Sequence, residues 1–324
     1  MRSNAEGSPQ TKYCHTSVLP RETIDGLGLA EGGICCDGTL GGGGHAALIC
    51  EKIGGSGTLI GIDRDGEAIA AARKRLEQYP CKKLFSQANF ENIRAVLAKA
   101  RIPAINGAAL DLGVSSRQLD EAGRGFSYMN DGPLDMRMDG SAENAGPSAA
   151  DVINEYDEKE LCRIIRDYGE ERWAKRIASF IVDERRRGRI ESTGELTEII
   201  KRAIPAAARR DGPHPAKRTF QAIRIEVNDE LGALERSLGA FIDVLKPGGR
   251  LAVITFHSLE DRIVKESFRK REAPCECPKG IPVCVCGKTA DARRVTRKPI
   301  LPTEGEMESN PRARSAKLRI LEKL

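Results

Sequence analysis

A turn of four consecutive glycines and an aspartate further along the chain are the residues best suited to hold a ligand. Residues 37–45 read Asp-Gly-Thr-Leu-Gly-Gly-Gly-Gly-His, and Asp63 ends the strand-like run 58–62. Because glycines lack Cβ atoms, a ligand can lie against this turn, beside the amide N–H groups of a helix that begins at His45. A carboxylate about 20 residues beyond such glycines is where a doubly wound fold binds the hydroxyls of an adenosine ribose. The alternative is a glycine-rich turn and an acidic strand end without a ligand.

A second carboxylate, Asp111, ends the apolar run 107–111. Ligands of doubly wound sheets bind outside the carboxyl ends of the strands, so we expect Asp111 on the same rim as Asp37 and Asp63. There it can accept a hydrogen bond from a substrate amino group or from a cofactor. The alternative role is a cap of the following helix or turn.

A predicted long helix over 217–238 carries two stripes. One is apolar and belongs to the core. The adjoining face carries four polar side chains: Arg218, Gln221, Arg224 and Asn228. Such side chains can bind phosphates or bases, and an ordinary solvated face is the alternative.

His257 follows a buried strand predicted at 250–256 and lies on the functional rim. It is a candidate substrate contact, although a lone histidine is more often structural. Ser258 begins the capping box Ser-Leu-Glu-Asp, which indicates a helix start and not a nucleophile.

Four of the ten cysteines stand in two close pairs. Cys275, Cys277, Cys284 and Cys286 flank a turn with proline and glycine, and four thiolates in a hairpin can hold Zn²⁺ tetrahedrally. The spacing is Cys-x-Cys, whereas Cys-x-x-Cys is usual, so thiols without a metal are the alternative. The other six cysteines have apolar neighbours and predict buried thiols of a reducing compartment.

Composition describes an ordinary globular protein. Of 324 residues, 40% are hydrophobic and 31% charged, and a net charge of +5 is too small to indicate a partner. Local basic clusters occur at 185–189, 293–298 and 312–319. No apolar run is long enough for a membrane span and residues 1–12 lack the apolar core of a signal peptide, which favours the cytoplasm.

Strand and helix signals alternate over residues 33–112. We expect strands at 33–37, 58–63, 82–86 and 107–111 and helices at 44–53, 66–78 and 90–100, which predicts a parallel sheet covered by helices. After a loop rich in glycine, aspartate and methionine at 123–140, only helical periodicity appears up to residue 215, including a capping box at 192–195.

The predicted fold class is therefore α/β, a doubly wound and mostly parallel sheet with an inserted all-α domain. The expected division assigns 1–115 to the first part of the core and 116–213 to the helical insertion. Residues 214–324 form the second part, with the cysteine hairpin at 275–286.

Taken together, these motifs resemble the bacterial 16S rRNA (cytosine-1402) N4-methyltransferase family. The matching segments run in order over nearly the whole chain: 15–19, 37–45, 61–65, 111–116, 125–127, 131–139, 168–172, 214–222, 256–262 and 310–315. Two departures are local: Arg117 replaces the usual proline, and Lys217 interrupts a His-Pro-Ala-Thr-Arg-like segment. The cysteine hairpin is not general to the family, so the resemblance does not settle its metal.

The resemblance implies a class I fold that uses S-adenosylmethionine to methylate the exocyclic N4 of a cytidine in 16S rRNA, either naked or in the small ribosomal subunit. The implied cofactor contacts are Gly43, Gly44, His45, Asp63, Phe90, Asp111 and Gln118. Asp63 suits the ribose hydroxyls, and Phe90 can cover the adenine. The oligomeric state stays open, a homodimer included.

Asp111 is the candidate catalytic residue. Related amine methyltransferases carry an Asp/Asn-Pro-Pro-aromatic turn after the fourth strand, but the turn here, 111–114, keeps only the acceptor. The target base must leave its RNA stack, and Phe126, Tyr128 and Phe256 are candidates to stack on it. Candidate RNA contacts are Arg218, Gln221, Arg224, Asn228, His257, Arg312 and Arg314.

Two other classes share parts of this pattern. A nicotinamide-dependent oxidoreductase would use the glycine turn and Asp63, but no hydride-site proton donor is evident. A non-catalytic RNA-binding protein would use the basic clusters and the cysteine hairpin alone.

Overall fold

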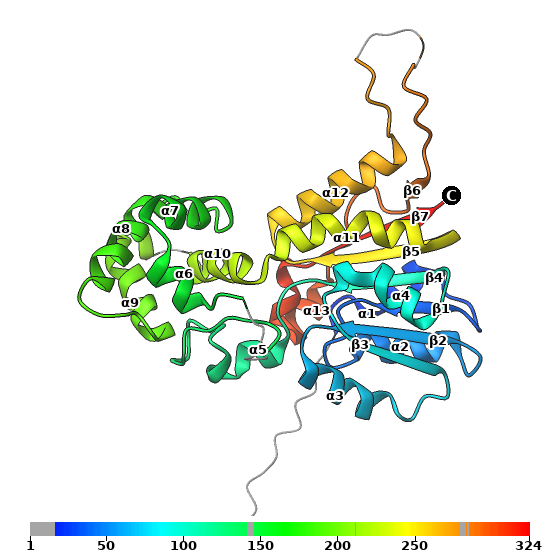
Figure 1. Cartoon of the computed structure of the whole chain (residues 1–324), viewed down its shortest axis with the longest axis horizontal. Coiled ribbons are helices and arrows are strands. Elements are labelled where there is room, and N and C mark those ends of the chain that lie inside the picture. Colours follow the sequence, from blue (N-terminus) through cyan, green and yellow to red (C-terminus); the bar gives the residue numbers. More distant parts are fainter. Residues whose placement is uncertain (1–16, 141–145, 211, 279–282, 284) are drawn as a thin grey trace, which may run out of the picture.

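A single seven-stranded sheet forms the centre of the core in the computed structural model, which describes residues 17–140, 146–210, 212–278, 283 and 285–324 (Figure 1). The strand order is β3-β2-β1-β4-β5-β7-β6. Strands β1 to β5 run parallel, and β7 pairs antiparallel with both β5 and β6. The strands are β1 Ile34–Asp37, β2 Thr58–Asp63, β3 Lys82–Gln87, β4 Ile105–Asp111, β5 Leu245–Thr255, β6 Ala292–Arg294 and β7 Lys317–Lys323. This arrangement confirms the predicted doubly wound α/β class.

Two layers of helices cover the sheet, because successive side chains of a strand point to opposite faces. Cys35 and Leu59 pack in the apolar cluster with α1, α2 and α3, while Cys36 and Ile60 pack with α4, α11 and α12. The helices are α1 Pro20–Leu27, α2 Gly44–Ile53, α3 Gly66–Leu76, α4 Ile93–Ala100, α11 Glu230–Val244, α12 Ser258–Glu272 and α13 Glu304–Ser309.

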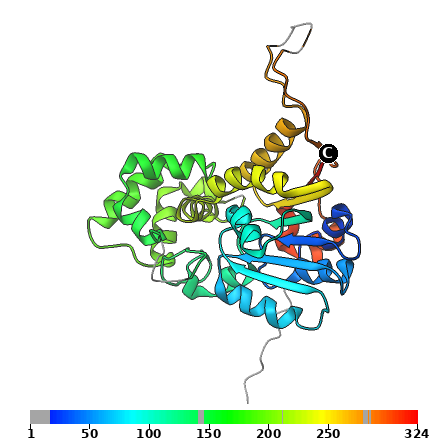
Figure 2. The same cartoon turned by 45° about the vertical axis from the view of Figure 1, so that its right-hand side comes forward.

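A group of helices lies to one side of the sheet and surrounds its own apolar cluster (Figures 1 and 2). These helices are α6 Ala149–Glu155, α7 Glu158–Asp167, α8 Ala174–Arg185, α9 Thr193–Ala203 and α10 Lys217–Asn228, and the short α5 Ser116–Asp120 precedes them. Phe220 and Ile223 of α10 belong to this cluster. The helical region is therefore built of residues on both sides of position 213.

The elements predicted between residues 33 and 112 are confirmed within two residues of their expected ends, except that a short 3₁₀ turn, Phe90–Asn92, precedes α4. The capping box of α9 is also confirmed, since Ser192 accepts from the Glu195 N–H. Helix α12 begins at Ser258 as predicted, but His257 is its N-cap residue.

The prediction of one helix over 217–238 is wrong. Helix α10 ends before Asp229, whose φ of 48° is left-handed, and α11 starts in a new direction at Glu230. A left-handed residue ends a helix because its carbonyl can no longer join the ladder of hydrogen bonds. The break takes the chain from the helical region back to the sheet.

The basic cluster at 312–319 is not an ordinary solvated segment. Its last residues form the start of β7, where the buried Arg319 pairs with Asp261 at 2.6 Å. Four of the six scattered cysteines are buried as predicted; Cys162 is only half-buried and Cys14 lies outside the described residues. No helix within the described ranges is long and apolar enough to cross a membrane.

Candidate active site

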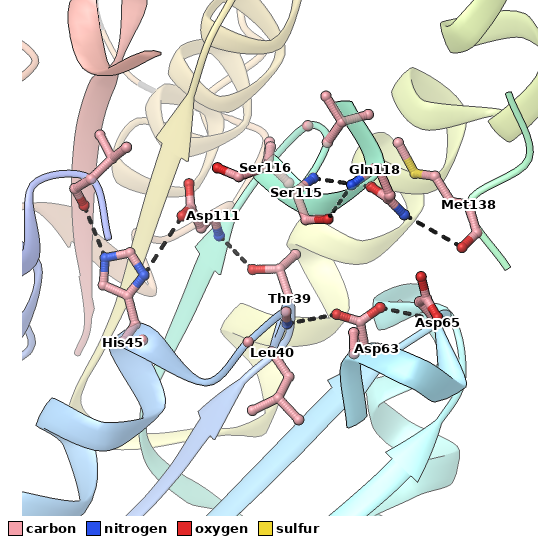
Figure 3. Close-up of a pocket in the computed structure, with 18 of the residues that line it drawn as sticks. Thr39, Leu40, His45, Asp63, Asp65, Asp111, Ser115, Ser116, Gln118 and Met138 are labelled. Carbon is pink, nitrogen blue, oxygen red and sulfur yellow. Dashed lines mark hydrogen bonds and ion pairs between the residues drawn. The ribbon is translucent and has the colours of Figure 1, made fainter. Parts of the chain in front are cut away.

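A cavity of about 170 Å³ opens at the carboxyl ends of β1, β2 and β4, beside the point where the strand order reverses. Its walls come from the glycine turn, the ends of β2 and β4, the start of α5 and a segment near the C-terminus (Figure 3). Six of the seven predicted cofactor residues line it: Gly44, His45, Asp63, Phe90, Asp111 and Gln118.

The glycine turn approaches its neighbours too closely for side chains. A Cβ on Gly44 would lie 2.0 Å from Oγ of Ser17. Gly43 has a φ of 77°, and a Cβ there would lie 3.2 Å from that of Ala72 on α3. Gly43 thus packs on α3 and does not line the cavity, whereas nothing lies within 4 Å of a Cβ placed on Gly42. Gly41, Gly42 and Gly44 line the cavity, and the space beside Gly42 is the most open to a ligand.

Asp63 lies at the end of β2 and already holds two backbone groups. Its carboxylate accepts hydrogen bonds from the N–H of Gly41 at 2.7 Å and of Asp65 at 2.9 Å. Burial raises the pKa of this carboxyl, and these two N–H donors partly offset the rise. A carboxylate has about four lone-pair positions, so Asp63 keeps acceptors for a ligand diol.

Asp111 presents an unused acceptor at the end of β4. Its backbone N–H donates to Thr39 Oγ1 at 2.6 Å, and Oδ2 lies 3.6 Å from Nδ1 of His45 (Figure 3). The other oxygen, Oδ1, is buried and has no hydrogen-bond partner among the described residues. Burial, together with the nearby charge of Glu260, raises the pKa of Asp111 to about 7. An orphaned carboxylate oxygen beside a cavity indicates a ligand that donates a hydrogen bond.

His45 is buried, with one ring nitrogen hydrogen-bonded and the other facing Asp111. Its Nε2 lies 2.9 Å from the carbonyl oxygen of Val18, opposite the approach to Asp111. Burial lowers the pKa of His45, so the ring is neutral near pH 7. His45 therefore connects the N-terminal segment to Asp111.

Glu260 of α12 lines the cavity, although sequence analysis gave it only a capping role. It is 2% exposed and accepts from the Phe256 N–H at 2.8 Å, and its Oε1 lies 3.2 Å from Nε2 of His257. Burial alone would raise the pKa of Glu260, but His257 and the Phe256 N–H outweigh it and hold the pKa below its ordinary value. His257 itself does not line the cavity.

The loop at 123–140 forms another wall and is tied at several points. Arg124 pairs with Asp65 at 3.0 Å and donates to the carbonyl of Met138 at 3.0 Å. Asn228 donates to the carbonyl of Met136 at 2.7 Å and accepts from the N–H of Met138 at 2.9 Å. Met138 consequently lies against the cavity, where its carbonyl also faces Gln118 (Figure 3).

The polar side chains of α10 form hydrogen bonds and an ion pair with other parts of the protein. Arg218 donates to the carbonyl of Glu170 and Gln221 to that of Tyr168, both at 3.1 Å. Arg224 forms a two-pronged pair with Glu230, at 2.7 and 2.9 Å, and both side chains are largely buried. Asn228 thus joins α10 to the loop and Arg224 joins it to α11, whereas Arg218 and Gln221 join it to the segment between α7 and α8.

The C-terminal segment returns to the cavity. Arg312 lines it and pairs with Asp120 at 2.6 Å, while Arg314 is exposed. Glu306 accepts from the N–H of Leu19 at 2.7 Å, which fastens this segment to the start of α1.

Of the candidates for stacking on a base, one lines the cavity. That residue is Phe256. Phe126 is buried in the helical cluster, and Tyr128 stacks on His214 with ring centres 4.7 Å apart. The turn 111–114 therefore has an aromatic neighbour from the residue that follows β5, in place of one within its own sequence.

Several lining residues were not predicted: Ser17, Thr39, Met138, Glu230, Glu260 and Asn310. The sequence did offer a signal for Asn310 and Ser17, because both lie in segments that resemble the family. Glu230 had no such signal, because it enters the site only through the chain break at Asp229.

The sheet order with an antiparallel β7 and the cavity at its switch point define a class I methyltransferase. The model of the MraW methylase family matches residues 12–324, and the chain belongs to that family. This confirms the predicted methyltransferase class and its cofactor, S-adenosylmethionine.

Relatives of similar length are known. A protein of Clostridioides difficile (strain 630) named ribosomal RNA small subunit methyltransferase H is 53% identical over 313 residues, which cover 97% of this chain and 100% of the relative. A protein of the same name from Acetivibrio thermocellus is 55% identical over 315 residues, with coverages of 97% and 100%. The solved structure of an rRNA methylase from Streptococcus thermophilus matches with a TM-score of 0.39 and 13% identity, covering 94% of this chain and 95% of that one.

Proposed function

We propose that this methylase transfers the methyl group of S-adenosylmethionine to the exocyclic N4 of a cytidine in 16S rRNA, at position 1402. The relatives' name, ribosomal RNA small subunit methyltransferase H, supports small-subunit rRNA as the substrate. The observation that carries the proposal is that Asp63, suited to a ribose, and Asp111, an acceptor without a partner, line one cavity.

The lining residues fit the cofactor. Asp63 would hold the ribose hydroxyls, Phe90 would cover the adenine, and the backbone at Gly42 would lie along the methionine part. The same cavity is lined by the acidic residues Asp63, Asp65, Asp111, Glu230 and Glu260. Asp65 pairs with Arg124 and Glu230 with Arg224, which leaves Asp63, together with Asp111 once it is ionised, to favour a ligand that carries a cationic sulfonium.

Methyl transfer to the amine requires a hydrogen-bond acceptor beside it, and Asp111 would be that acceptor. When bound, S-adenosylmethionine supplies an electrophilic methyl group on a positively charged sulfur. The N4 lone pair of cytosine is delocalised into the ring, so the amine needs alignment and polarisation. Oδ1 of Asp111 would accept a hydrogen bond from the amine, holding its lone pair toward the methyl carbon. As the N–C bond forms and the C–S bond breaks, the extra N4 proton passes to this carboxylate.

Other residues are assigned to the RNA. We assign stacking on the splayed base to Phe256, since it lines the cavity beside Asp111. Arg312 and Arg314 would meet phosphates at the rim. Arg218, Gln221, Arg224 and Asn228 have partners in the protein, so their contribution to RNA binding would be indirect, through the loop and helical region that they tie. His257 would act through Glu260.

The remaining assignments follow the same reasoning. The protein would act in the cytoplasm, where ribosomes are assembled. The division into core parts 1–115 and 214–324 around a helical insertion at 116–213 is retained, with the packing of α10 favouring a later second boundary. A homodimer is compatible with this function but is not required by it.

The test is methyl incorporation from labelled S-adenosylmethionine into small subunits and naked 16S rRNA from a strain that lacks the modification. We expect one methyl group, mapped by mass spectrometry to N4 of the cytidine at 1402. Asp111→Asn should lower turnover far more than cofactor affinity, measured by calorimetry. A methyl group on another base or atom would contradict the proposed substrate, and equal losses of turnover and affinity would contradict the acceptor role.

A further inference from the structure

Residues 273–278 and 285–291 are the two described legs of an arm between α12 and β6, and they extend away from the sheet (Figures 1 and 2). Three thiols from its two legs converge: the Sγ atoms of Cys275, Cys277 and Cys286 all lie within 4.8 Å of one another. The methyl-transfer cavity has no lining residue in this arm. The cluster therefore has no part in the chemistry described above.

We infer that Cys275, Cys277 and Cys286 bind a structural Zn²⁺ ion that holds the two legs of the arm together. Three soft thiolates with no carboxylate among the converging ligands select zinc over hard cations such as Mg²⁺. Cys284 lies outside the described residues, and the inference does not include it.

The spacing of the thiols fits such an ion. The Sγ atoms of Cys275 and Cys286 are 3.8 Å apart. Zn–S bonds of about 2.3 Å in a tetrahedron place two sulfurs about 3.8 Å apart, so this pair already has the length of one tetrahedron edge. Cys277, within 4.8 Å, needs only a small movement to complete a third position.

Regular secondary structure does not join the described residues of the two legs. Among the arm's described residues there is no helix or strand between Glu272 and Ala292, and Val283 and Val285 are 70% and 78% exposed. Where the described residues form no regular secondary structure, the entropy of the chain favours separation of the legs. Metal–thiolate bonds are strong enough to oppose this.

The two ends of the arm are held differently. At the base, Arg271 pairs with Asp291 at 2.7 Å and Arg294 with Glu272 at 2.5 Å. Near the thiols, Lys288 pairs with Glu276 at 2.5 Å, but both groups are exposed, and such pairs contribute little to stability.

The first experiment measures metal in the full chain after expression in zinc-replete medium. We expect about one zinc per chain, bound through purification without chelator. The double variant Cys275→Ser/Cys286→Ser should lose it, and Cys162→Ser, a half-buried thiol on α7, should retain it. Equal zinc in the double variant and the wild type would overturn the inference.

A second measurement does not depend on any variant. Cobalt added to zinc-stripped wild-type protein should give the intense charge-transfer absorption of cobalt–thiolate bonds, displaced by one equivalent of zinc. No such band, or an intact mass lighter by the two hydrogens of a disulfide, would overturn the inference.

S-adenosylmethionine affinity of the double variant should stay within about twofold of the wild type, because the arm contributes nothing to the cavity. That readout also separates loss of metal from loss of the fold.

Discussion

The Nδ1 atom of His45 lies 3.6 Å from Oδ2 of Asp111, while its Nε2 lies 2.9 Å from the carbonyl oxygen of Val18. A carbonyl oxygen can only accept, so Nε2 carries the proton of the neutral ring and Nδ1 turns a lone pair toward Asp111. Two facing lone pairs repel unless Asp111 is protonated, which agrees with its raised pKa. The structure thus favours a protonated Asp111 in the absence of a ligand.

This relationship predicts a pH dependence of kcat/KM. The acceptor must be a carboxylate, and the pKa of Asp111 in the ligand-free protein is about 7, so the rate at subsaturating substrates (kcat/KM) should rise with pH and level off above that value. Asp111→Asn should have a low kcat/KM without this inflection. A profile that is flat between about pH 6 and 8 in the wild type would contradict the acceptor role.

The same pKa predicts a stability change. The unfolded pKa is 3.8 and the folded pKa about 7, so within this window the folded protein keeps a proton that the unfolded chain has lost. Stability from Asp111 therefore falls as pH rises through the window. The melting temperature of Asp111→Asn relative to wild type should rise between about pH 5 and pH 8. A constant difference would show that the pKa of Asp111 is not raised.

Asp63→Ala should weaken S-adenosylmethionine binding by about 1.5–3 kcal/mol, the range for hydrogen bonds to a charged group. The loss has two sources: the ribose contacts, and the positions of the Gly41 and Asp65 N–H groups that Asp63 fixes. Calorimetric titration measures it, with Asp25→Ala on the exposed side of α1 as a control. Unchanged affinity would remove Asp63 from the cofactor site.

Phe256→Leu should lower kcat/KM for rRNA, because stacking of a base on an aromatic ring contributes about 1–3 kcal/mol. Phe256→Tyr keeps the ring and should recover most of the activity. The measurement is methylation rate against rRNA concentration at saturating cofactor. Equal activity of the leucine and tyrosine variants would mean that the base stacks elsewhere.

Replacing Arg312 and Arg314 together by alanine should flatten the salt dependence of RNA binding. Each phosphate contact to single-stranded RNA contributes a log–log slope of about −0.7, so the slope should change by roughly one to one and a half units. The matched control is Arg186→Ala/Arg187→Ala, two exposed arginines of the helical region. If only the control pair changes the slope, the RNA path runs over residues 185–189.

Asn228→Ala should destabilise the protein by about 1–3 kcal/mol, because it leaves the Met136 carbonyl and the Met138 N–H without their partner. Urea unfolding measures this loss. Gln221 lies on the same helix as Asn228. Gln221→Ala removes a single hydrogen bond, to the Tyr168 carbonyl, and should therefore lower the stability by less. A larger effect at Gln221 would contradict the role of Asn228 as the tie between α10 and the loop.

The sequence pattern was sufficient to predict those parts of the fold and site whose residues are close in the chain as well as in space. The glycine turn and Asp63 belong to one βαβ unit, so their spacing fixed their place at the sheet's carboxyl edge. Strands β1, β2 and β4 were predictable because parallel strands buried on both faces are continuously apolar, whereas the edge strand β3 is only half apolar and was predicted from its place in the alternation of strands and helices. Strand β7 was missed although it is buried between β5 and β6, because charged residues alternate with apolar ones along Lys317–Lys323, and β6 is a short edge strand.

The sequence by itself determined the fold class, the family and which residues lie at the carboxyl edge of the sheet, because these depend on short motifs and regular periodicity. Only the tertiary structure decided which residues share the cavity. It assigned Gly43 to packing, placed Phe256 and Glu260 beside Asp111, and engaged Arg218 and Arg224 within the protein. The physical reason is that such contacts join segments far apart in the chain, and their partners are set by how helices and loops pack, which no local pattern records.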